Sequence, residues 1–222
     1  KKLYITILAT LFMSAYAYAG SYNLGVSGSL IDVNADGTET TTAGDVGGGA
    51  ANTNSTSVDN QAIIASIFAE YEMDDGIVFG FEHVPGSADV SKNVRSRTET
   101  AQGVSGTDAD GVVTRKAQAE VENLNTLYVE YPIGGYYVRA GFTQVDVNTT
   151  ETVPTSSGTY GNTTLDGLNL GVGFKGSLGD YFTKLSVEYT DFEDLSLTST
   201  TSNKITADLD TTQLKFAIGK SF

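Results

Sequence analysis

Residues 168–175 read Leu-Asn-Leu-Gly-Val-Gly-Phe-Lys, and this stretch decides the fold class. Its apolar side chains occupy the even positions, whereas Asn169, two glycines and Lys175 occupy the odd ones. A period of two residues puts the two sets on opposite faces of an extended strand. The stretch therefore predicts a β-strand with one apolar and one polar face.

The same alternation recurs along the chain. With residues 168–175, the expected strands are 22–30, 63–71, 77–82, 127–131, 136–143, 181–189 and 213–222. Three connections are short (74–76, 132–135 and 176–180), and four are long and polar (34–59, 85–116, 148–163 and 195–206). Strict alternation of short and long connections is typical of an up-and-down barrel with one plain and one elaborated rim. We therefore expect an all-β, eight-stranded antiparallel barrel.

Composition excludes several classes of function. The 222 residues are enough for one domain of ordinary size. Lys and Arg number 13 and Asp and Glu 27, so the formal charge of −14 opposes nucleic-acid binding, which requires a basic surface. The chain has no cysteine and one histidine, which excludes disulfides, thiolate metal sites and multi-histidine metal centres.

The first residues have the pattern of an export signal. Lys1 and Lys2 precede an apolar run from Leu3 to Met13, and Ala17-Tyr18-Ala19 fits the small-x-small cleavage rule. The apolar run is shorter than the roughly 20 residues that a membrane-spanning helix needs. The expected organisation is a signal peptide over residues 1–19 and a single barrel domain over residues 20–222.

Three features indicate that the apolar face of the barrel contacts lipid. The polar face is rich in Gly, Ser and Thr, which suits the narrow interior of an eight-stranded barrel. The last residue of the final strand is Phe222. Tyrosines gather on the apolar face near the short connections, as in an interfacial aromatic girdle. The expected girdle is Tyr22, Tyr71, Tyr131, Tyr136 and Tyr181, joined by Phe222.

The signal-peptide pattern, the alternating strands and the closing Leu214-x-Phe216-x-Ile218-x-x-x-Phe222 together resemble the small outer-membrane β-barrel proteins. This group includes the OmpA transmembrane domain, OmpX, OmpW and the porin family. The resemblance implies the outer membrane of a Gram-negative bacterium, with its lipid as a partner and both termini in the periplasm. It also implies that the terminal segment is read by the barrel-insertion machinery, although Lys220 departs from the usual apolar residue. No particular activity is implied.

Charged residues on the polar face form the most interesting candidate site. Because an isolated buried charge is costly, charges inside a narrow barrel should pair. They could act as a gate or selectivity element, or as a structural plug that closes the lumen, and we favour the plug. The members of this lumen charge network are Glu70, Glu82, Glu130, Arg139, Lys175, Lys184, Glu188 and Lys215.

A short acidic segment resembles part of a calcium-binding loop. Asp32-x-Asn34-x-Asp36-Gly37 matches the first half of a calcium loop, but Ala43 occupies the position of the expected glutamate. An acidic Asx-turn loop is the favoured interpretation, so no metal site is expected.

His83 is the single candidate for imidazole catalysis, with Glu82, Ser87 and Asp89 nearby in sequence. Proximity in sequence does not set the distance between a base and a nucleophile, so we expect a surface histidine. No enzyme activity and no cofactor are expected.

Two roles therefore remain. The protein is either a structural or surface-interaction protein that presents acidic loops to an unknown extracellular partner, or a narrow porin-like channel for small solutes. We expect the first, because eight strands leave an interior about wide enough for side chains alone.

Overall fold

A computed structural model describes residues 20–41, 51–90, 95–101, 111–152, 159–200 and 202–222. The expected signal peptide lies outside this range. Within the described residues, no helix combines the length and apolarity needed to cross a bilayer. The strands are β1 (Gly20–Thr41), β2 (Asn52–Met73), β3 (Val78–Asp89), β4 (Arg95–Ala101), β5 (Gly111–Ile133), β6 (Tyr136–Thr152), β7 (Thr163–Leu178), β8 (Tyr181–Phe192), β9 (Leu195–Thr198) and β10 (Lys204–Ser221).

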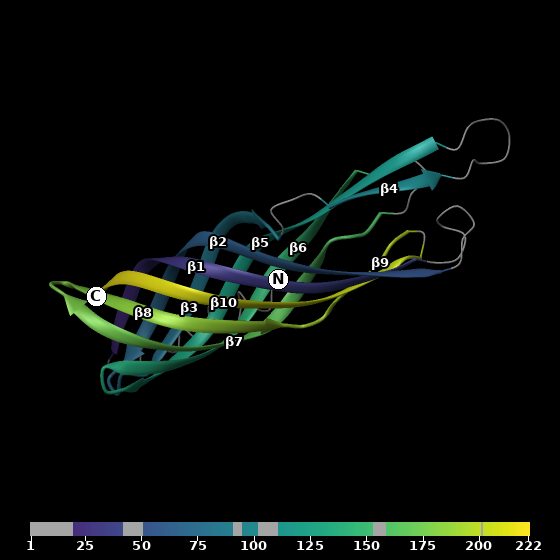
Figure 1. Cartoon of the computed structure of the whole chain (residues 1–222). Helices are drawn as coiled ribbons and strands as arrows, with labels where there is room; N and C mark the ends of the chain where they lie inside the picture. The colour runs from purple at the N-terminus through teal and green to yellow at the C-terminus, as the bar shows by residue number, and fades with distance from the viewer. Residues whose placement is uncertain (1–19, 42–50, 91–94, 102–110, 153–158, 201) are drawn as a thin grey trace.

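Eight strands form a closed antiparallel ring. The order is β1-β2-β3-β5-β6-β7-β8-β10, and β10 pairs with β1 from Asn23↔Ser221 to Thr40↔Lys204. The other two strands are additions at one end, where β4 pairs with β5 and β9 pairs with β10 (Figure 1). The prediction of an eight-stranded, antiparallel, up-and-down barrel is confirmed.

The short connections are tight hairpin turns at one end of the barrel, which we call the short-turn end. Gly76, Gly134 and Gly179 adopt φ angles of 82°, 66° and 61°, which side chains other than glycine rarely tolerate. Two of the turns are tighter than expected, because Pro132 and Ile133 still belong to β5 and residues 176–178 to β7, whereas the first is one residue longer, because β3 begins at Val78.

The expected long polar loops are largely strand, so their predicted extent was wrong. β1 and β2 remain paired as far as Thr41↔Asn52, and β4 and β9 lie inside two of the supposed loops. These ribbons project at the opposite end, the long-strand end (Figure 1). Their Thr, Ser and Val residues favour extended backbone. The alternation of polarity disappears there because water can reach both faces of a projecting ribbon.

The polarity of the barrel wall inverts along each strand. In β1, Leu24 and Val26 face outward and Ser27 inward, but nearer the long-strand end Val33 faces inward and Asp32 outward. In other strands the inward residues beyond the inversion include Val145, Val147, Leu165, Phe192 and Leu209, which pack together. The outward residues at this level include Asp32, Gln61, Gln144, Asp166, Asp191 and Asp210.

This inversion locates the lipid. Over the half of the barrel next to the short turns, large apolar side chains are exposed on the outside and polar ones are buried inside. Beyond the inversion, the wall has the apolar-in, polar-out pattern of a barrel surrounded by water. The protein is therefore a transmembrane β-barrel whose apolar belt ends where the outward aspartates begin.

Candidate functional site

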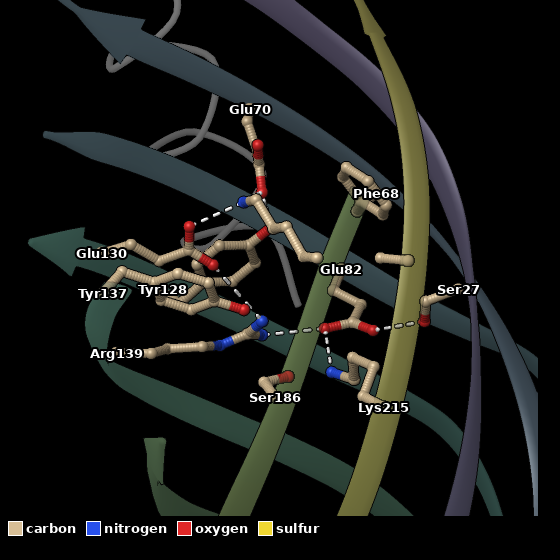
Figure 2. Close-up of a pocket in the computed structure, with 12 residues that line it drawn as sticks. Ser27, Phe68, Glu70, Glu82, Tyr128, Glu130, Tyr137, Arg139, Ser186 and Lys215 are labelled. Carbon is tan, nitrogen blue, oxygen red and sulfur yellow. Dashed lines mark hydrogen bonds and ion pairs between the residues drawn. The ribbon is translucent and has the colours of Figure 1, made fainter. Parts of the chain in front are cut away.

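Seven of the eight charges predicted for the lumen meet in the barrel interior, and all seven are buried. Arg139 on β6 lies at the centre, with its guanidinium 2.8 Å from Glu82 on β3 and 3.3 Å from Glu188 on β8. Figure 2 shows Arg139 and Lys215 converging on the Glu82 carboxylate from different strands. We call this set the interior charge network: Glu70, Glu82, Glu130, Arg139, Lys184, Glu188 and Lys215.

Two lysines bridge pairs of carboxylates. The Lys184 ammonium lies 2.5 Å from Glu70 and 2.6 Å from Glu130. Lys215 lies 2.7 Å from Glu82 and 3.0 Å from Glu188. Each lysine therefore connects acids that are far apart in the sequence, and the network ties six of the eight ring strands together through charge-assisted hydrogen bonds.

Polar neighbours supply the donors that the network lacks. Four acids face three bases, a formal imbalance of 3 − 4 = −1 among these residues. Tyr128 donates a 2.7 Å hydrogen bond to Glu70, Ser66 a 2.6 Å hydrogen bond to Glu82, and Ser186 a 2.9 Å hydrogen bond to Glu188. These three residues share the inward parity of the charges but were not among the predicted members of the network.

The eighth predicted member, Lys175, lies outside this network. It binds Glu72 at 2.6 Å near the short-turn end, where the two side chains are 32% and 24% exposed. The expectation that Lys175 joins the other charges was therefore wrong. Glu72 lies on the same inward-facing alternate positions as Glu70, so the alternation could have predicted the pair of Lys175 with Glu72.

Four aromatic rings pack around the network, each over a glycine on the neighbouring strand. The glycine leaves the space that the ring occupies, since a Cβ atom at any of these glycines would overlap the ring. The space left among the lining residues is about 10 Å³, roughly the volume that one water molecule requires. The pairs are Phe68 with Gly25, Tyr128 with Gly80, Tyr137 with Gly173, and Phe182 with Gly219.

The tyrosines of the expected aromatic girdle differ in how far they are exposed. Tyr131, Tyr136 and Tyr181 are exposed on the outside near the short turns. Tyr71 is only 8% exposed, because its ring packs 5.3 Å from that of the half-buried Tyr22. The interfacial role of these tyrosines stays a prediction.

The proposed assembly segment forms the outer face of β10 and continues to Phe222, one residue beyond the end of this strand at Ser221. Leu214 and Phe216 are exposed, and the backbone of Phe222 exchanges hydrogen bonds of 2.8 and 3.2 Å with Tyr22. Phe222 is 70% exposed, and the Lys220 ammonium lies 5.7 Å from its ring centroid. Ile218 follows the same outward parity. Recognition of this segment by the insertion machinery stays a prediction.

The calcium motif lies on an extended strand. Asp32, Asn34 and Asp36 belong to β1, so the favoured interpretation as an Asx-turn loop was wrong. Asn34 donates a 3.2 Å hydrogen bond to Asp210 on β10. Alternate residues of a strand are too widely spaced to surround one cation, and the described residues contain no cluster of three or more His, Asp or Glu that could hold a metal ion.

His83 lies on the outward parity of β3. A ring nitrogen is 2.9 Å from the Asn125 side-chain oxygen, and the backbone between Val84 and Ser87 bulges. The partner of the imidazole is therefore an amide rather than a nucleophile.

Comparison with known proteins shows that the chain resembles some of them in fold. No protein-family model matches the sequence, and no curated protein matches it. Among solved structures, the chain is similar to the outer membrane protein OprG from Pseudomonas aeruginosa, with 14% identity over 92% of this chain and 97% of that chain and a TM-score of 0.46.

Two other similar structures are also outer-membrane proteins. AlkL, determined in lipid bilayers, is 19% identical over 92% of this chain and 91% of that chain, with a TM-score of 0.48. The outer membrane protease OmpT from Escherichia coli is 8% identical over 91% of this chain and 97% of that chain, with a TM-score of 0.44. The assignment of the fold rests on the closed ring of strands in this chain itself.

Proposed function

We propose that this protein is a non-enzymatic barrel of the Gram-negative outer membrane with a structural or surface-interaction role and a blocked lumen. The interior charge network is the observation that supports this proposal. It crosses the interior with side chains from opposite walls and leaves about 10 Å³ free. An ion that passed this level would have to separate several buried ion pairs at once, each of which stabilises the others.

The long-strand end supports a surface role. Ribbons of β1 and β2 continue beyond the level at which the wall polarity inverts, and their outward positions carry acidic residues such as Asp36 and Asp59. A projecting acidic surface is suited to a cationic partner or to keeping neighbouring molecules apart by charge. Lipid of the outer membrane would surround the apolar belt.

Planar-bilayer recording of the purified barrel tests the blocked lumen. We expect no stable unitary current, whereas a 16-stranded porin inserted under the same conditions should conduct, since open aqueous pores come with about 16–18 strands. Reproducible unitary currents from the parent protein would overturn the proposal and support the alternative, a narrow porin-like channel for small solutes.

A further inference from the structure

A single positive charge lies on the lipid-facing wall of the barrel. Among the described residues, Lys220 on β10 is the only charged side chain that faces outward between the short turns and the level at which the wall polarity inverts. The outward residues that precede it on this strand, Phe216 and Ile218, are apolar. Lys220 therefore interrupts the apolar belt at a position where the alternation predicts another apolar residue.

Lys220 lies at the edge of the apolar belt, next to the short-turn end. It is paired with Leu24 on β1 and with Tyr181, the first residue of β8 after the turn at Gly179. A lysine on the lipid face is costly at the middle of a bilayer and is tolerated near its surface, where the ammonium can reach the headgroups. The Lys220 ammonium is thus at the level of the headgroups of one leaflet.

Two hydrogen-bond donors at this position have no partner for their polar groups among the described residues. The Lys220 ammonium lies 5.7 Å from the Phe222 ring centroid but forms no ion pair with these residues. Tyr181 is 49% exposed beside it, and its hydroxyl forms no hydrogen bond with them. Directly opposite side chains of an antiparallel pair have Cβ atoms about 5 Å apart. The ammonium and the phenol hydroxyl can therefore donate to one acceptor.

The surroundings of these two donors are apolar. Leu24, Phe216 and Phe222 are exposed on the same outer face. The acceptor must therefore belong to a molecule that also presents hydrocarbon to this wall. A phospholipid meets both conditions, because its phosphate oxygens accept strong hydrogen bonds from an ammonium and its acyl chains lie against the apolar belt.

The charge of the rest of the protein makes this site recognisable in an experiment. The formal charge of the chain is −14, and the short turns carry Asp74, Asp75 and Asp180. A protein of this charge repels anionic lipid on average. A preference for an anionic headgroup at the short-turn end therefore requires a local cation, which Lys220 supplies.

We propose that Lys220 and Tyr181 bind the phosphate of an anionic phospholipid, such as phosphatidylglycerol, in the leaflet at the short-turn end. The ammonium would neutralise the phosphate, the Tyr181 hydroxyl would donate one hydrogen bond, and an acyl chain would lie along Leu24 and Ile218. Phosphatidylcholine would bind less tightly, because its own choline cation neutralises its phosphate. The site does not depend on a blocked lumen, so a barrel that conducts ions could still bind the lipid.

NMR of the barrel in lipid nanodiscs tests the site. Phosphatidylglycerol replaces phosphatidylcholine in steps, and the backbone amide resonances of Leu24 and Tyr181 are followed. We expect shifts that saturate with the mole fraction of phosphatidylglycerol. Lys220→Gln should weaken this binding by about fivefold, the equivalent of about 1 kcal/mol for one lysine near anionic lipid. Lys220→Arg keeps the charge and should bind within a factor of about two of the parent.

Lys204→Gln is a matched control that removes the same charge from the same strand. Lys204 is exposed and forms no ion pair with the described residues, but it lies at the long-strand end. This variant should bind phosphatidylglycerol as the parent does. If the shifts in the parent do not saturate, if Lys220→Gln binds unchanged, or if Lys204→Gln weakens binding equally, the proposal is wrong.

The contribution of the hydroxyl is tested separately. Tyr181→Phe removes only the hydroxyl and should weaken binding by about fivefold, as expected for one hydrogen bond worth about 1 kcal/mol. Unchanged binding would refute the role of Tyr181 as a donor.

Two measurements on the parent protein do not depend on the folding of any variant. Glycerol 3-phosphate, added to barrels in pure phosphatidylcholine nanodiscs, should leave the Leu24 and Tyr181 resonances in place. Saturable shifts would show that phosphate from water suffices and would overturn the assignment to lipid. Phosphatidylglycerol with a nitroxide on its headgroup should broaden the Tyr181 resonance more than equally labelled phosphatidylcholine does. Equal broadening would refute the preference for an anionic headgroup.

Discussion

At the scale of single residues, Arg139 contacts three of the four acids of the interior charge network. Its guanidinium is 2.8 Å from Glu82, 3.3 Å from Glu188 and 3.9 Å from Glu130, and it lies 3.5 Å from the centroid of the Tyr128 ring. The Arg139 side chain is 4% exposed. Its charge is therefore shielded from water and is balanced by the neighbouring carboxylates.

Replacement of Arg139 by alanine should destabilise the barrel by about 3–5 kcal/mol, because it removes one positive charge from a buried network in which the carboxylates already outnumber the bases. Urea unfolding in lipid vesicles measures this loss. Lys175→Ala removes the half-exposed pair with Glu72 and should lose about 0–1 kcal/mol. Equal losses in the two variants would contradict the view that the interior charge network stabilises the barrel.

The second residue-scale prediction concerns the space that glycines leave for rings. A Cβ atom at Gly80 would overlap the Tyr128 ring, whose hydroxyl donates to Glu70. Gly80→Ala should therefore destabilise the barrel by about 1–3 kcal/mol through overpacking. Gly28→Ala is the control, since no atom lies within 4 Å of its added Cβ.

A double-mutant cycle distinguishes two causes of the loss: overlap between the added methyl group at Gly80 and the Tyr128 ring, and a general effect of alanine on the strand. In a Tyr128→Ala background the ring is gone, so Gly80→Ala should have little further effect on the urea midpoint. Additive losses would show that the overlap is not the cause.

The direction of a side chain could be predicted where its place in the alternating sequence pattern alone determines which face of the strand it occupies. The seven charges of the interior charge network share the inward parity and were found from it. Tyr128 shares this inward parity, but its role was missed because only the register Gly80↔Tyr128 reveals that its ring packs over a glycine. Lys175 was misplaced because parity gives the direction of a side chain but not its height along the barrel.

At the scale of elements, β10 both closes the ring and carries the segment that resembles an insertion signal. Phe222→Ala keeps the backbone hydrogen bonds to Tyr22 and removes only the exposed ring. We expect a lower yield of folded, membrane-inserted protein in cells and unchanged refolding into lipid vesicles in vitro. Unchanged yield in cells would show that this ring is not part of a recognised signal.

The outer part of β10 also carries a pH-sensitive contact. Asp208 lies beyond the apolar belt, opposite Asp36 on β1. A hydrogen bond with Asp194 and the charges of Asp194, Asp191 and Asp36 raise the pKa of Asp208 above its ordinary value. The folded barrel thus binds this proton more tightly than the unfolded chain does, so the contribution of Asp208 to stability is lost as pH rises through the raised pKa.

Asp208→Asn should therefore raise the urea midpoint above that of the parent at neutral pH and reduce the stabilisation that the parent gains on acidification. Urea unfolding across the acidic range measures both effects. Asp180→Asn, at the exposed turn between β7 and β8, is the control and should keep the parent's pH dependence. A parent-like pH dependence in Asp208→Asn would rule out the repulsion between these carboxylates.

The positions of the strands could be predicted from the sequence within the apolar belt but not beyond it. Lipid outside and a packed polar interior enforce a strict alternation in segments such as 168–175. Beyond the belt, Ile31, Val33 and Ala35 take the inward parity of Ser27 and Ser29. The inverted pattern was not recognised as a continuation of the same strand, and for this reason the length of β1 and the apolar packing inside this end of the barrel were not foreseen.

At the scale of the whole molecule, ring closure removes the exposed edges that an open sheet would present to lipid. β1 is paired on one side with β2 and on the other with β10 over nearly its whole length. In a bilayer each unpaired backbone group costs several kcal/mol, so partial opening of the ring is strongly disfavoured. The pairing of β2 with β3 ends at Ile67↔His83, and beyond this point the Asn60 side chain donates a hydrogen bond to the Asp89 carbonyl on β3.

A closed ring with a buried charge network inside it should unfold as a unit and resist detergent. Unboiled protein in a denaturing gel should therefore migrate differently from boiled protein, and reducing agent should have no effect because the chain contains no cysteine. Ala217→Pro should abolish the difference: Ala217 is paired with Ser27 on β1 and with Lys184 on β8, and proline cannot donate in a central strand. Ala217→Ser keeps the donor and should retain the parent's mobility shift. A mobility shift that survives Ala217→Pro would mean that resistance to detergent does not depend on closure between β1 and β10.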